Sequence, residues 1–401
     1  MNDTPVRHLP ADTADTADTA DTADTDRTDR SHRPARTVLV YGAYGHTGRF
    51  VVAELLRRAW TPVLSGRDAA RLRTLSEEHG GLDVRPAAVD DAAALDRALA
   101  GAAAVINCAG PFASTAAPVI EAALRAGVPY VDVAAELEAV ADTFARFDDR
   151  AREAGALIVP AMAFYGGLGD LLVSAALGDR READEVVTAY ALSSWRPTAG
   201  TRAAGRVSRE RRNGRRRLHT NGSLEYRTGE PPLSRWSFPA PVGDRDVVGE
   251  FTMADSVTVP RHVDVPEMRT VMSAAAVEDL TSPDTAPPAA VDERGRSDQT
   301  FLVEAVVRFD GRERRAVARG RDIYAISAPL AVEAVARILD GRTLDNGSVE
   351  GLRVEGRPGP GGVVPAGALF DAADFLSALT DRASGGAEGF GWSLTAPDRP
   401  S

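Results

Sequence analysis

Thr37–Phe50 reads TVLVYGAYGHTGRF, and this stretch decides the fold of the N-terminal part of the chain. The apolar run Val38–Tyr41 meets glycines at a spacing of three, and an apolar segment that suits a helix follows. Gly42 lets the chain turn sharply, Gly45 lets the backbone approach a phosphate, and Gly48 lets the helix pack close to the strand. A strand, a glycine turn and a helix in this order direct free N–H groups and a helix dipole at a diphosphate. The stretch therefore predicts a bound dinucleotide, and with it redox chemistry; a glycine turn of some other α/β protein stays open, because the usual fingerprint reads G-x-G-x-x-G.

Composition and charge describe an ordinary globular chain. Its 401 residues are 44% hydrophobic and 26% charged, which suits a protein of two domains. Eight Asp and three Arg give residues 1–30 a charge of −5, so the remaining chain carries −6 of the total of −11. This mild acidity does not suggest nucleic-acid binding. The sequence shows no membrane-length apolar run and no secretory leader, and its single cysteine excludes an internal disulfide, so we expect a cytoplasmic protein.

All 47 basic residues are arginine, and the sequence contains no lysine. This excludes a Schiff-base lysine, a pyridoxal-phosphate enzyme, a P-loop NTPase and any Tyr-x-x-x-Lys dehydrogenase. His46, His219 and His262 do not have metal-ligand spacing, so we expect no metal site.

Four segments follow from the patterns along the chain. Residues 1–35 contain five copies of Ala-Asp-Thr and predict a disordered tail. Residues 36–165 alternate short apolar runs with helix-length segments, which predicts an α/β fold with a Rossmann-type, doubly wound parallel sheet. Residues 166–380 predict a second α+β domain with a mostly antiparallel sheet, whose closing helices we expect to pack back on the first domain. Residues 381–401 predict a flexible tail.

The expected elements are short and regularly spaced. The strands of the first domain are expected at Val38–Tyr41, Pro62–Ser65, Asp83–Ala88, Ala104–Cys108, Tyr130–Val133 and Ala156–Val159. Its helices are expected at Arg49–Arg58, Ala69–His79, Ala92–Leu99, Thr115–Arg125 and Leu137–Glu153. The second domain is expected to have strands at Glu185–Ser193, Val247–Phe251, Met268–Val271, Phe301–Phe309 and Arg314–Arg319, and closing helices at Pro329–Leu339 and Ala366–Leu379.

The end of the second predicted strand distinguishes the two nicotinamide cofactors. NAD-selective sites place an acidic residue there for the ribose 2′-hydroxyl, but this chain has Ser65 and Arg67. A guanidinium at this position pairs with a 2′-phosphate and stacks on adenine, so we predict NADP(H); alternatively, Arg67 only solvates a turn. Asp90, after the third strand, borders the adenine, caps a helix, or does both.

Further candidates lie at the carboxyl ends of later strands, where the cofactor crevice is expected. Asp132 is a carboxylate inside an apolar strand, so it is either paired or turned towards the cleft. Tyr165, at the crossing between the domains, is a candidate proton donor or a packing residue. The catalytic candidates are thus Tyr165 and Asp132, and the predicted cofactor contacts are Gly42, Tyr44, Gly45, His46, Thr47, Gly48, Ser65, Arg67, Asp90, Asn107, Ala109, Gly110, Pro111 and Phe112.

Arginines concentrate in one stretch of the second domain, Arg202–Arg217, which holds eight of them. The stretch is either a solvated face or a surface that recognises an anionic substrate or an acidic acyl carrier protein.

Four motifs together resemble the saccharopine dehydrogenase-like family. They are GAYGHTG at 42–48, SGRD at 65–68, NCAGPF at 107–112 and YVDVAAE at 130–136. Ala199-Gly200-Thr201 and GVVPA at 362–366 are similar to the trans-acting enoyl reductase branch. The resemblance implies an NADP(H)-binding Rossmann domain and a hydride-transferring second domain.

The chain departs from the family pattern in two places. Ala135 stands where the family's YVDxxGE has glycine, and residues 163–170 read AFYGGLGD. The resemblance implies a catalytic lysine for the lysine-forming members, so we do not expect that activity in a chain without lysine.

We therefore predict an NADPH-dependent oxidoreductase that transfers hydride to an unsaturated or carbonyl-type metabolite of enoyl or polyketide kind. One alternative is an imine or amino-acid reductase of the saccharopine dehydrogenase type, and another is a non-catalytic NADP(H)-binding scaffold or redox sensor. The expected partners are a small-molecule substrate, an acidic acyl carrier protein and a second copy in a homodimer.

Overall fold

The computed structural model describes residues 36–344, 361–383 and 389–395. The predicted Ala-Asp-Thr tail at 1–35 lies outside the described residues, as do 384–388 and 396–401 of the predicted C-terminal tail.

The first sheet has seven parallel strands in the order β15-β6-β5-β4-β1-β2-β3. Their bounds are β1 (Thr37–Tyr41), β2 (Thr61–Gly66), β3 (Val84–Pro86), β4 (Ala104–Asn107), β5 (Tyr130–Asp132), β6 (Leu157–Val159) and β15 (Gly362–Val363). The chain winds outward from β1 in one direction and from β4 in the other, so a crevice opens where the carboxyl ends of these two strands meet.

Helices cover both faces of this sheet, because alternate strand residues point to opposite sides. Val38 and Val40 belong to a core with α1, α2 and α10, whereas Leu39 and Tyr41 belong to a core with α3, α4 and α5. The helices are α1 (His46–Arg57), α2 (Ala69–Glu78), α3 (Ala92–Leu99), α4 (Phe112–Ala126), α5 (Leu137–Ala154) and α10 (Ser327–Leu339). The predicted doubly wound fold is confirmed.

Two helices of the first domain begin earlier than expected. Helix α1 starts at His46 rather than Arg49, and α4 starts at Phe112 rather than Thr115. In both cases the residue before the helix, Gly45 or Pro111, is extended and ends the turn abruptly, so the first helical turn belongs to the loop motif rather than to the apolar repeat that suggested the helix.

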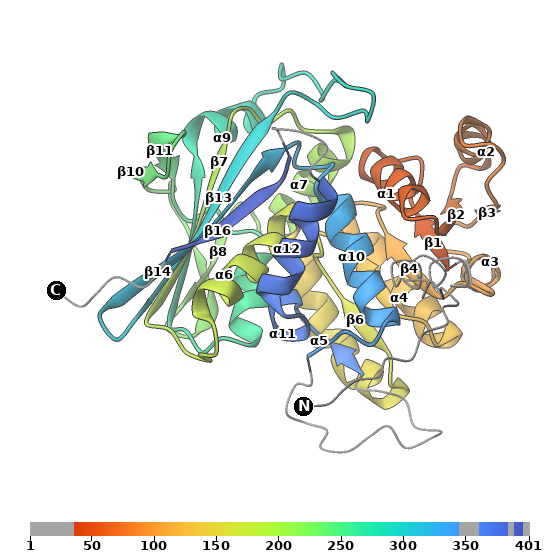
Figure 1. Cartoon of the computed structure of the whole chain (residues 1–401), viewed down its shortest axis with the longest axis horizontal. Helices are drawn as coiled ribbons and strands as arrows, with labels where there is room; N and C mark the ends of the chain where they lie inside the picture. Colours follow the sequence, from red (N-terminus) through yellow and green to blue (C-terminus); the bar gives the residue numbers. More distant parts are fainter. Residues whose placement is uncertain (1–35, 345–360, 384–388, 396–401) are drawn as a thin grey trace, which may run out of the picture. The chain divides into compact units, whose positions relative to one another are not determined.

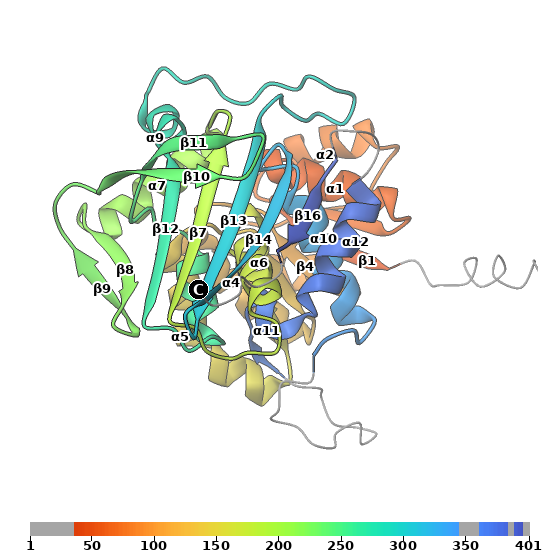
Figure 2. The ribbon, with the colours of Figure 1, turned by 60° about the vertical axis from the view of Figure 1, so that its left-hand side comes forward.

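The second sheet is mixed, with its main strands in the order β10-β11-β12-β7-β13-β14-β16 and the β8–β9 hairpin on β12. Its strands are β7 (Glu185–Leu192), β8 (Arg216–Thr220), β9 (Ser223–Arg227), β10 (Leu233–Phe238), β11 (Gly243–Val248), β12 (Glu267–Ser273), β13 (Thr300–Phe309), β14 (Arg312–Arg321) and β16 (Gly391–Leu394). The pair β12–β7 is parallel and the other pairs are antiparallel, which agrees with the predicted mostly antiparallel sheet. Figure 2 shows β12, β7, β13 and β14 side by side, with β10 and β11 across them.

Several elements of the second domain were not predicted. The strands β8 and β9 and the helix α7 (Ala199–Arg211) are rich in charged side chains, and β10 is mostly exposed, so these elements lack the apolar alternation that identifies a strand or the apolar stripe that identifies a helix. Strand β16 lies within the predicted flexible tail, where it pairs with β14; this corrects the expectation for those residues. The expected helix at Ala366–Leu379 is divided into α11 (Ala366–Leu369) and α12 (Ala372–Ala383).

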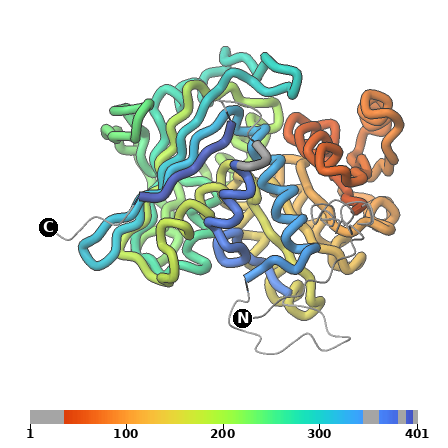
Figure 3. Tube along the Cα trace, in the orientation of Figure 1, coloured from red at the N-terminus to blue at the C-terminus, as the bar shows by residue number. Residues whose placement is uncertain are grey.

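Helices α6 (Gly169–Leu177), α10 and α12 lie between the two sheets (Figure 1). Figure 3 shows the blue α10 running beside the red α1, although the two are far apart in the sequence. A buried carboxylate, that of Glu333 on α10, joins them: it pairs with Arg58 at 2.7 Å and with Arg337 at 3.0 Å. The shorter helices are α8 (Asp255–Thr258) and α9 (Ala274–Thr281).

Candidate functional site

One pocket, with a volume of about 1430 Å³, extends from the carboxyl edge of the first sheet to the second sheet. Its walls come from the glycine turn after β1, the ends of β2 to β5, the start of α7 and the segment 248–253. None of the helices in the described ranges combines the length and the apolar character that a membrane crossing requires.

The glycine turn has no room for side chains. A Cβ on Gly48 would lie 2.3 Å from the Gly42 carbonyl oxygen, and a Cβ on Gly45 would lie 3.1 Å from the same atom. Gly42 has a φ of +82°, which favours glycine, and its Cβ would lie 2.9 Å from Ala109. Helix α1 has no acidic residue in its first turn, so its dipole and free N–H groups face the pocket uncompensated. The cradle therefore fits the diphosphate of a dinucleotide.

The adenine end of the pocket carries two exposed arginines, Arg67 and Arg71. The Arg71 guanidinium lies 4.4 Å from the centre of the Tyr44 ring, and a Cβ on Gly66 would meet that ring at 3.0 Å. Asp90 is exposed at the same end. These two guanidinium groups give this end of the pocket the positive charge expected of a site for a ribose 2′-phosphate, which is the role predicted for Arg67.

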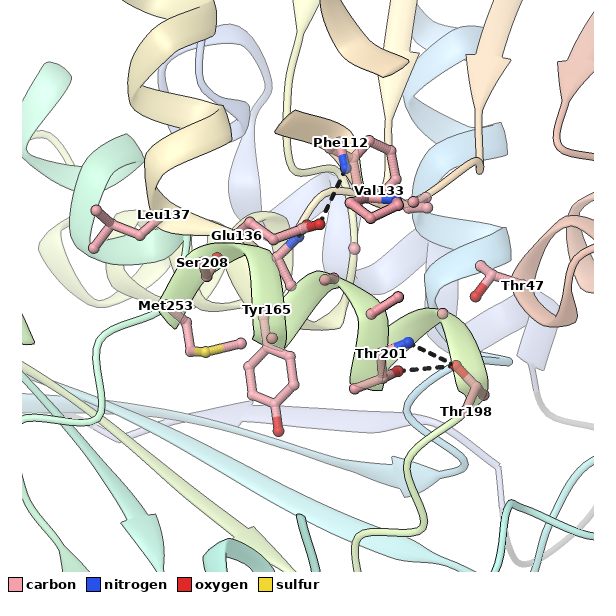
Figure 4. Close-up of a pocket in the computed structure, with 18 of the residues that line it drawn as sticks. Thr47, Phe112, Val133, Glu136, Leu137, Tyr165, Thr198, Thr201, Ser208 and Met253 are labelled. Atoms are coloured by element: carbon pink, nitrogen blue, oxygen red, sulfur yellow. Dashed lines mark hydrogen bonds between the residues drawn. The ribbon is translucent and has the colours of Figure 1, made fainter. Parts of the chain in front are cut away.

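Side-chain hydrogen bonds of Asn107 and Glu136 hold the loop between β4 and α4 in place. The Asn107 amide oxygen accepts a hydrogen bond from the Ala109 N–H at 3.0 Å, and its amide nitrogen donates to the Tyr130 hydroxyl at 3.1 Å. Glu136 accepts a hydrogen bond from the Phe112 N–H at 3.1 Å (Figure 4). Burial raises the pKa of the Glu136 carboxyl above its usual value. These bonds fix the backbone of a loop that carries several of the predicted cofactor contacts.

The Asp132 carboxylate is buried and paired with hydrogen-bond donors of the protein. It accepts hydrogen bonds from the Tyr130 hydroxyl at 2.8 Å, from the Ala134 N–H at 3.0 Å and from the Ala161 N–H at 2.7 Å. Burial raises its pKa to about 6. Of the two predicted arrangements, the structure shows the paired one, in which Asp132 connects β5 to the crossing at Ala161.

Aromatic side chains form the wall where the pocket meets the second sheet. Tyr165 stacks on Trp195, with ring centres 5.2 Å apart, and Figure 4 shows its hydroxyl pointing away from Glu136. Burial raises the pKa of the Tyr165 hydroxyl well above its usual value, so this group stays protonated. His46 lies edge-on to Tyr324 at 5.1 Å, and burial lowers its pKa, so it packs as a neutral ring.

The start of α7 completes the pocket opposite the glycine turn. Thr198 caps this helix by accepting a hydrogen bond from the Thr201 N–H at 3.1 Å (Figure 4). The Thr201 and Tyr324 hydroxyls are 2.9 Å apart, so the helix start, Tyr324 and the neighbouring His46 form a continuous wall.

The arginine stretch 202–217 is largely paired within the protein. Arg211 pairs with Asp142 at 2.7 Å, Arg212 with Glu138 at 3.2 Å, and Arg216 with Glu250 at 2.7 Å. Arg202 donates to backbone carbonyls at 282 and 285, and Arg215 and Arg217 lie against the Tyr226 ring.

The structure brings most predicted site residues to this pocket. Those that line it are Gly42, Tyr44, Gly45, His46, Thr47, Arg67, Asp90, Ala109, Gly110, Pro111, Phe112 and Tyr165. Those that lie behind its lining and support it are Gly48, Ser65, Asn107 and Asp132. Their placement agrees with a cofactor site, and their individual roles stay predictions.

Other pocket residues were missed by the sequence analysis. Arg71 lies in the first turn of α2, directly after the SGRD motif at 65–68, and its nearness to that motif was a usable signal. Trp195, Thr198 and Tyr324 come from segments without a motif, and only the fold brings them together.

Comparison with known proteins agrees with this geometry. Residues 38–159 match the family model of the saccharopine dehydrogenase NADP binding domain, which agrees with the predicted cofactor, NADP(H). The probable mitochondrial saccharopine dehydrogenase-like oxidoreductase of Arabidopsis thaliana is 32% identical over 142 residues, which are 32% of this chain and 31% of that protein. The trans-acting enoyl reductase of Mycobacterium ulcerans is 30% identical over 142 residues, 34% of each chain.

The chain thus spans about a third of the length of the curated relatives that it matches. A solved structure extends the similarity to the whole fold. It is the apo saccharopine dehydrogenase (L-Glu forming) of Saccharomyces cerevisiae, with a TM-score of 0.59 and 14% identity, covering 90% of this chain and 100% of that one.

Proposed function

We propose that this chain is an NADPH-dependent oxidoreductase that reduces an unsaturated or carbonyl-type metabolite, because residues 38–159 match the family model of the saccharopine dehydrogenase NADP binding domain. The observation that carries the proposal is the single pocket. It joins the glycine cradle and Arg67 to an apolar wall that includes Phe251, Met253 and Leu280. A cofactor and a substrate with an apolar body can therefore lie in contact within one cavity.

Different groups of pocket residues bind the cofactor and supply the proton in such a reduction. The cofactor, when bound, supplies hydride to an electrophilic carbon, and the atom that receives the displaced electron pair takes up a proton. The glycine turn and the start of α1 hold the diphosphate, Arg67 and Arg71 hold the 2′-phosphate, and the loop 109–112 borders the nicotinamide ribose. Tyr165 is the candidate proton donor, because burial keeps its hydroxyl protonated.

The test is NADPH oxidation against a substrate panel. We expect tight NADPH binding and turnover with enones, enoyl thioesters, aldehydes or ketones. Turnover with only a cyclic imine, or with 2-oxo acids plus amines, would establish the imine or amino-acid reductase instead. NADPH binding without turnover of any of these classes, or of extracts rich in small metabolites, would overturn the proposal in favour of a scaffold or redox sensor.

The acyl carrier protein is the weakest part of the proposed partnership. Internal pairing of Arg211, Arg212 and Arg216 leaves less free positive charge on the arginine stretch than the sequence suggested. If a carrier docks there, charge reversal at Arg206 and Arg209, which are exposed, will weaken its binding. A homodimer and a cytoplasmic location also stay proposals, tested by sedimentation and by fractionation of cells.

A further inference from the structure

Two hydrogen-bond donors are buried without a well-placed acceptor where the pocket meets the second sheet. Among the residues that the structure describes, neither the Tyr165 hydroxyl nor the Trp195 indole Nε1 has an acceptor in good hydrogen-bond geometry, although the Trp195 indole interacts with the Tyr324 hydroxyl. Both side chains belong to the pocket wall, although only 5% of Tyr165 and 3% of Trp195 is exposed. Burying a donor without an acceptor is destabilising, so each of these groups requires an explanation.

The two donors belong to one stack of rings. The Tyr165 and Trp195 rings are 5.2 Å apart at an interplanar angle of 30°. Phe164 lies edge-on to Tyr165 with ring centres 4.8 Å apart, and Phe251 lies edge-on to Trp195 at 6.0 Å. The backbone N–H of Trp195 is held by the Asp279 carboxylate at 2.9 Å. This packing fixes both donors before any ligand arrives, which lowers the entropy cost of using them.

The chemistry of the pair selects the ligand atom. An indole N–H only donates, and the Tyr165 hydroxyl stays protonated because burial raises its pKa. A carbonyl oxygen has two lone pairs and can accept from both groups. A protonated imine nitrogen has no lone pair, and it would leave the Trp195 N–H without a partner.

We propose that Tyr165 and Trp195 together bind the carbonyl oxygen of the substrate. The proposal rests on the proposed function and adds the class of acceptor, an aldehyde, ketone or α,β-unsaturated carbonyl compound whose apolar body lies against Phe251 and Met253. The two polar atoms are covered in this structure, so the neighbouring side chains that cover them move aside when the ligand enters, while the Tyr165 and Trp195 rings stay in place. Two donors at this oxygen also stabilise the negative charge that develops there during reduction.

The test uses trans-cinnamaldehyde bound to the complex with NADP⁺, in which no turnover is needed. Infrared difference spectra with a ¹³C-labelled carbonyl report the hydrogen bonds at the oxygen. We expect a carbonyl stretch below that of the aldehyde in an apolar solvent. Trp195→Phe and Tyr165→Phe each remove one donor and keep the ring, so each should raise the frequency and weaken aldehyde binding about threefold to tenfold.

A matched control removes an indole N–H elsewhere. Trp236 donates to Glu304 at 2.8 Å outside the pocket lining, so Trp236→Phe should leave the carbonyl frequency unchanged. The imine probe 2-phenyl-1-pyrroline should bind no more weakly to Trp195→Phe than to the parent chain. Failure of the parent complex to bind the aldehyde, an unshifted frequency in both pocket variants, or equal losses for aldehyde and imine would overturn the proposal.

The outcomes separate this proposal from the proposed function. A shifted carbonyl stretch without NADPH oxidation by any carbonyl compound would leave the oxygen site standing and remove the enzyme activity. Reduction of imines alone would leave an oxidoreductase and remove the oxygen site. Either pocket variant is sufficient for the test, so the failure of one to fold does not prevent it.

Discussion

Replacement of Arg67 by alanine should weaken NADPH binding and leave NADH binding almost unchanged. Arg67 is exposed at the adenine end of the pocket, where the only chemical difference between the two cofactors, the 2′-phosphate, is expected to lie. A hydrogen bond to a charged group contributes about 1.5–3 kcal/mol, and exposure to solvent places Arg67 at the lower end. The dissociation constant for NADPH should therefore rise about tenfold. Arg71 retains part of the affinity, so Arg67→Ala with Arg71→Ala should lose more than either change alone.

The assay is titration of NADPH and NADH by cofactor fluorescence, repeated at low and high salt. Screening by salt should shrink the difference between parent and variant, because an exposed charge pair is involved. Arg73→Ala is the matched control, since Arg73 is exposed on α2 together with Arg71 and lies outside the pocket lining. Equal losses for NADPH and NADH, or a comparable loss in the control, would refute the reasoning.

Three further predictions concern stability. Gly48→Ala places a Cβ 2.3 Å from a backbone oxygen, so it should lower the free energy of unfolding by about 1–3 kcal/mol or more and weaken both cofactors; Gly391→Ala, which meets no described atom within 4 Å, is the control in urea unfolding. Burial raises the pKa of Asp255 to about 6, above the unfolded value, so its stabilisation is complete below about pH 4 and is lost as the pH rises through 6. Asp255→Asn should flatten that part of the pH–stability curve by about 1.4 kcal/mol per unit of pKa shift, and an unchanged slope would contradict the assignment. Glu333→Gln breaks a buried network and should cost about 3–5 kcal/mol in thermal unfolding, whereas Glu121→Gln at an exposed pair should cost about 1 kcal/mol or less; similar losses would contradict the argument from burial.

The sequence was sufficient where local chemistry decides the structure. The turn at 42–48 requires glycines at this spacing, because a Cβ added to any of the three would come too close to a neighbouring atom. The strands β1, β2, β4 and β5 are largely buried on both sides, so their short apolar runs were recognisable without knowledge of the fold. The candidate contacts from Gly42 to Phe112 lie on loops at one edge of that sheet, and parallel topology alone brings these loops together.

The remainder depended on long-range packing. Trp195 and Tyr324 become neighbours of Tyr165 and His46 only when the second sheet folds over the first, and their local sequences contain no motif for this. Helix α7 and strand β8 are rich in arginine, and their stability comes from partners such as Glu138 and Glu250 that are distant in the sequence. For Asp132 the sequence left two arrangements open, paired or turned towards the cleft, and its partners could not be identified because one of them is the backbone at Ala161.

The strand β15 and the helix α10 have a consequence for how the chain is made. During synthesis, the nucleotide-binding sheet emerges from the ribosome before Ser327–Leu339 can cover α1 and before Gly362–Val363 can pair with β6. For that interval the apolar side of α1 and the edge of β6 are open, which favours chaperone capture and association between nascent chains. Completion of the first sheet therefore waits until most of the second sheet has been translated, and a ribosome stalled before Gly362 should hold a nascent chain with an unfinished cofactor domain.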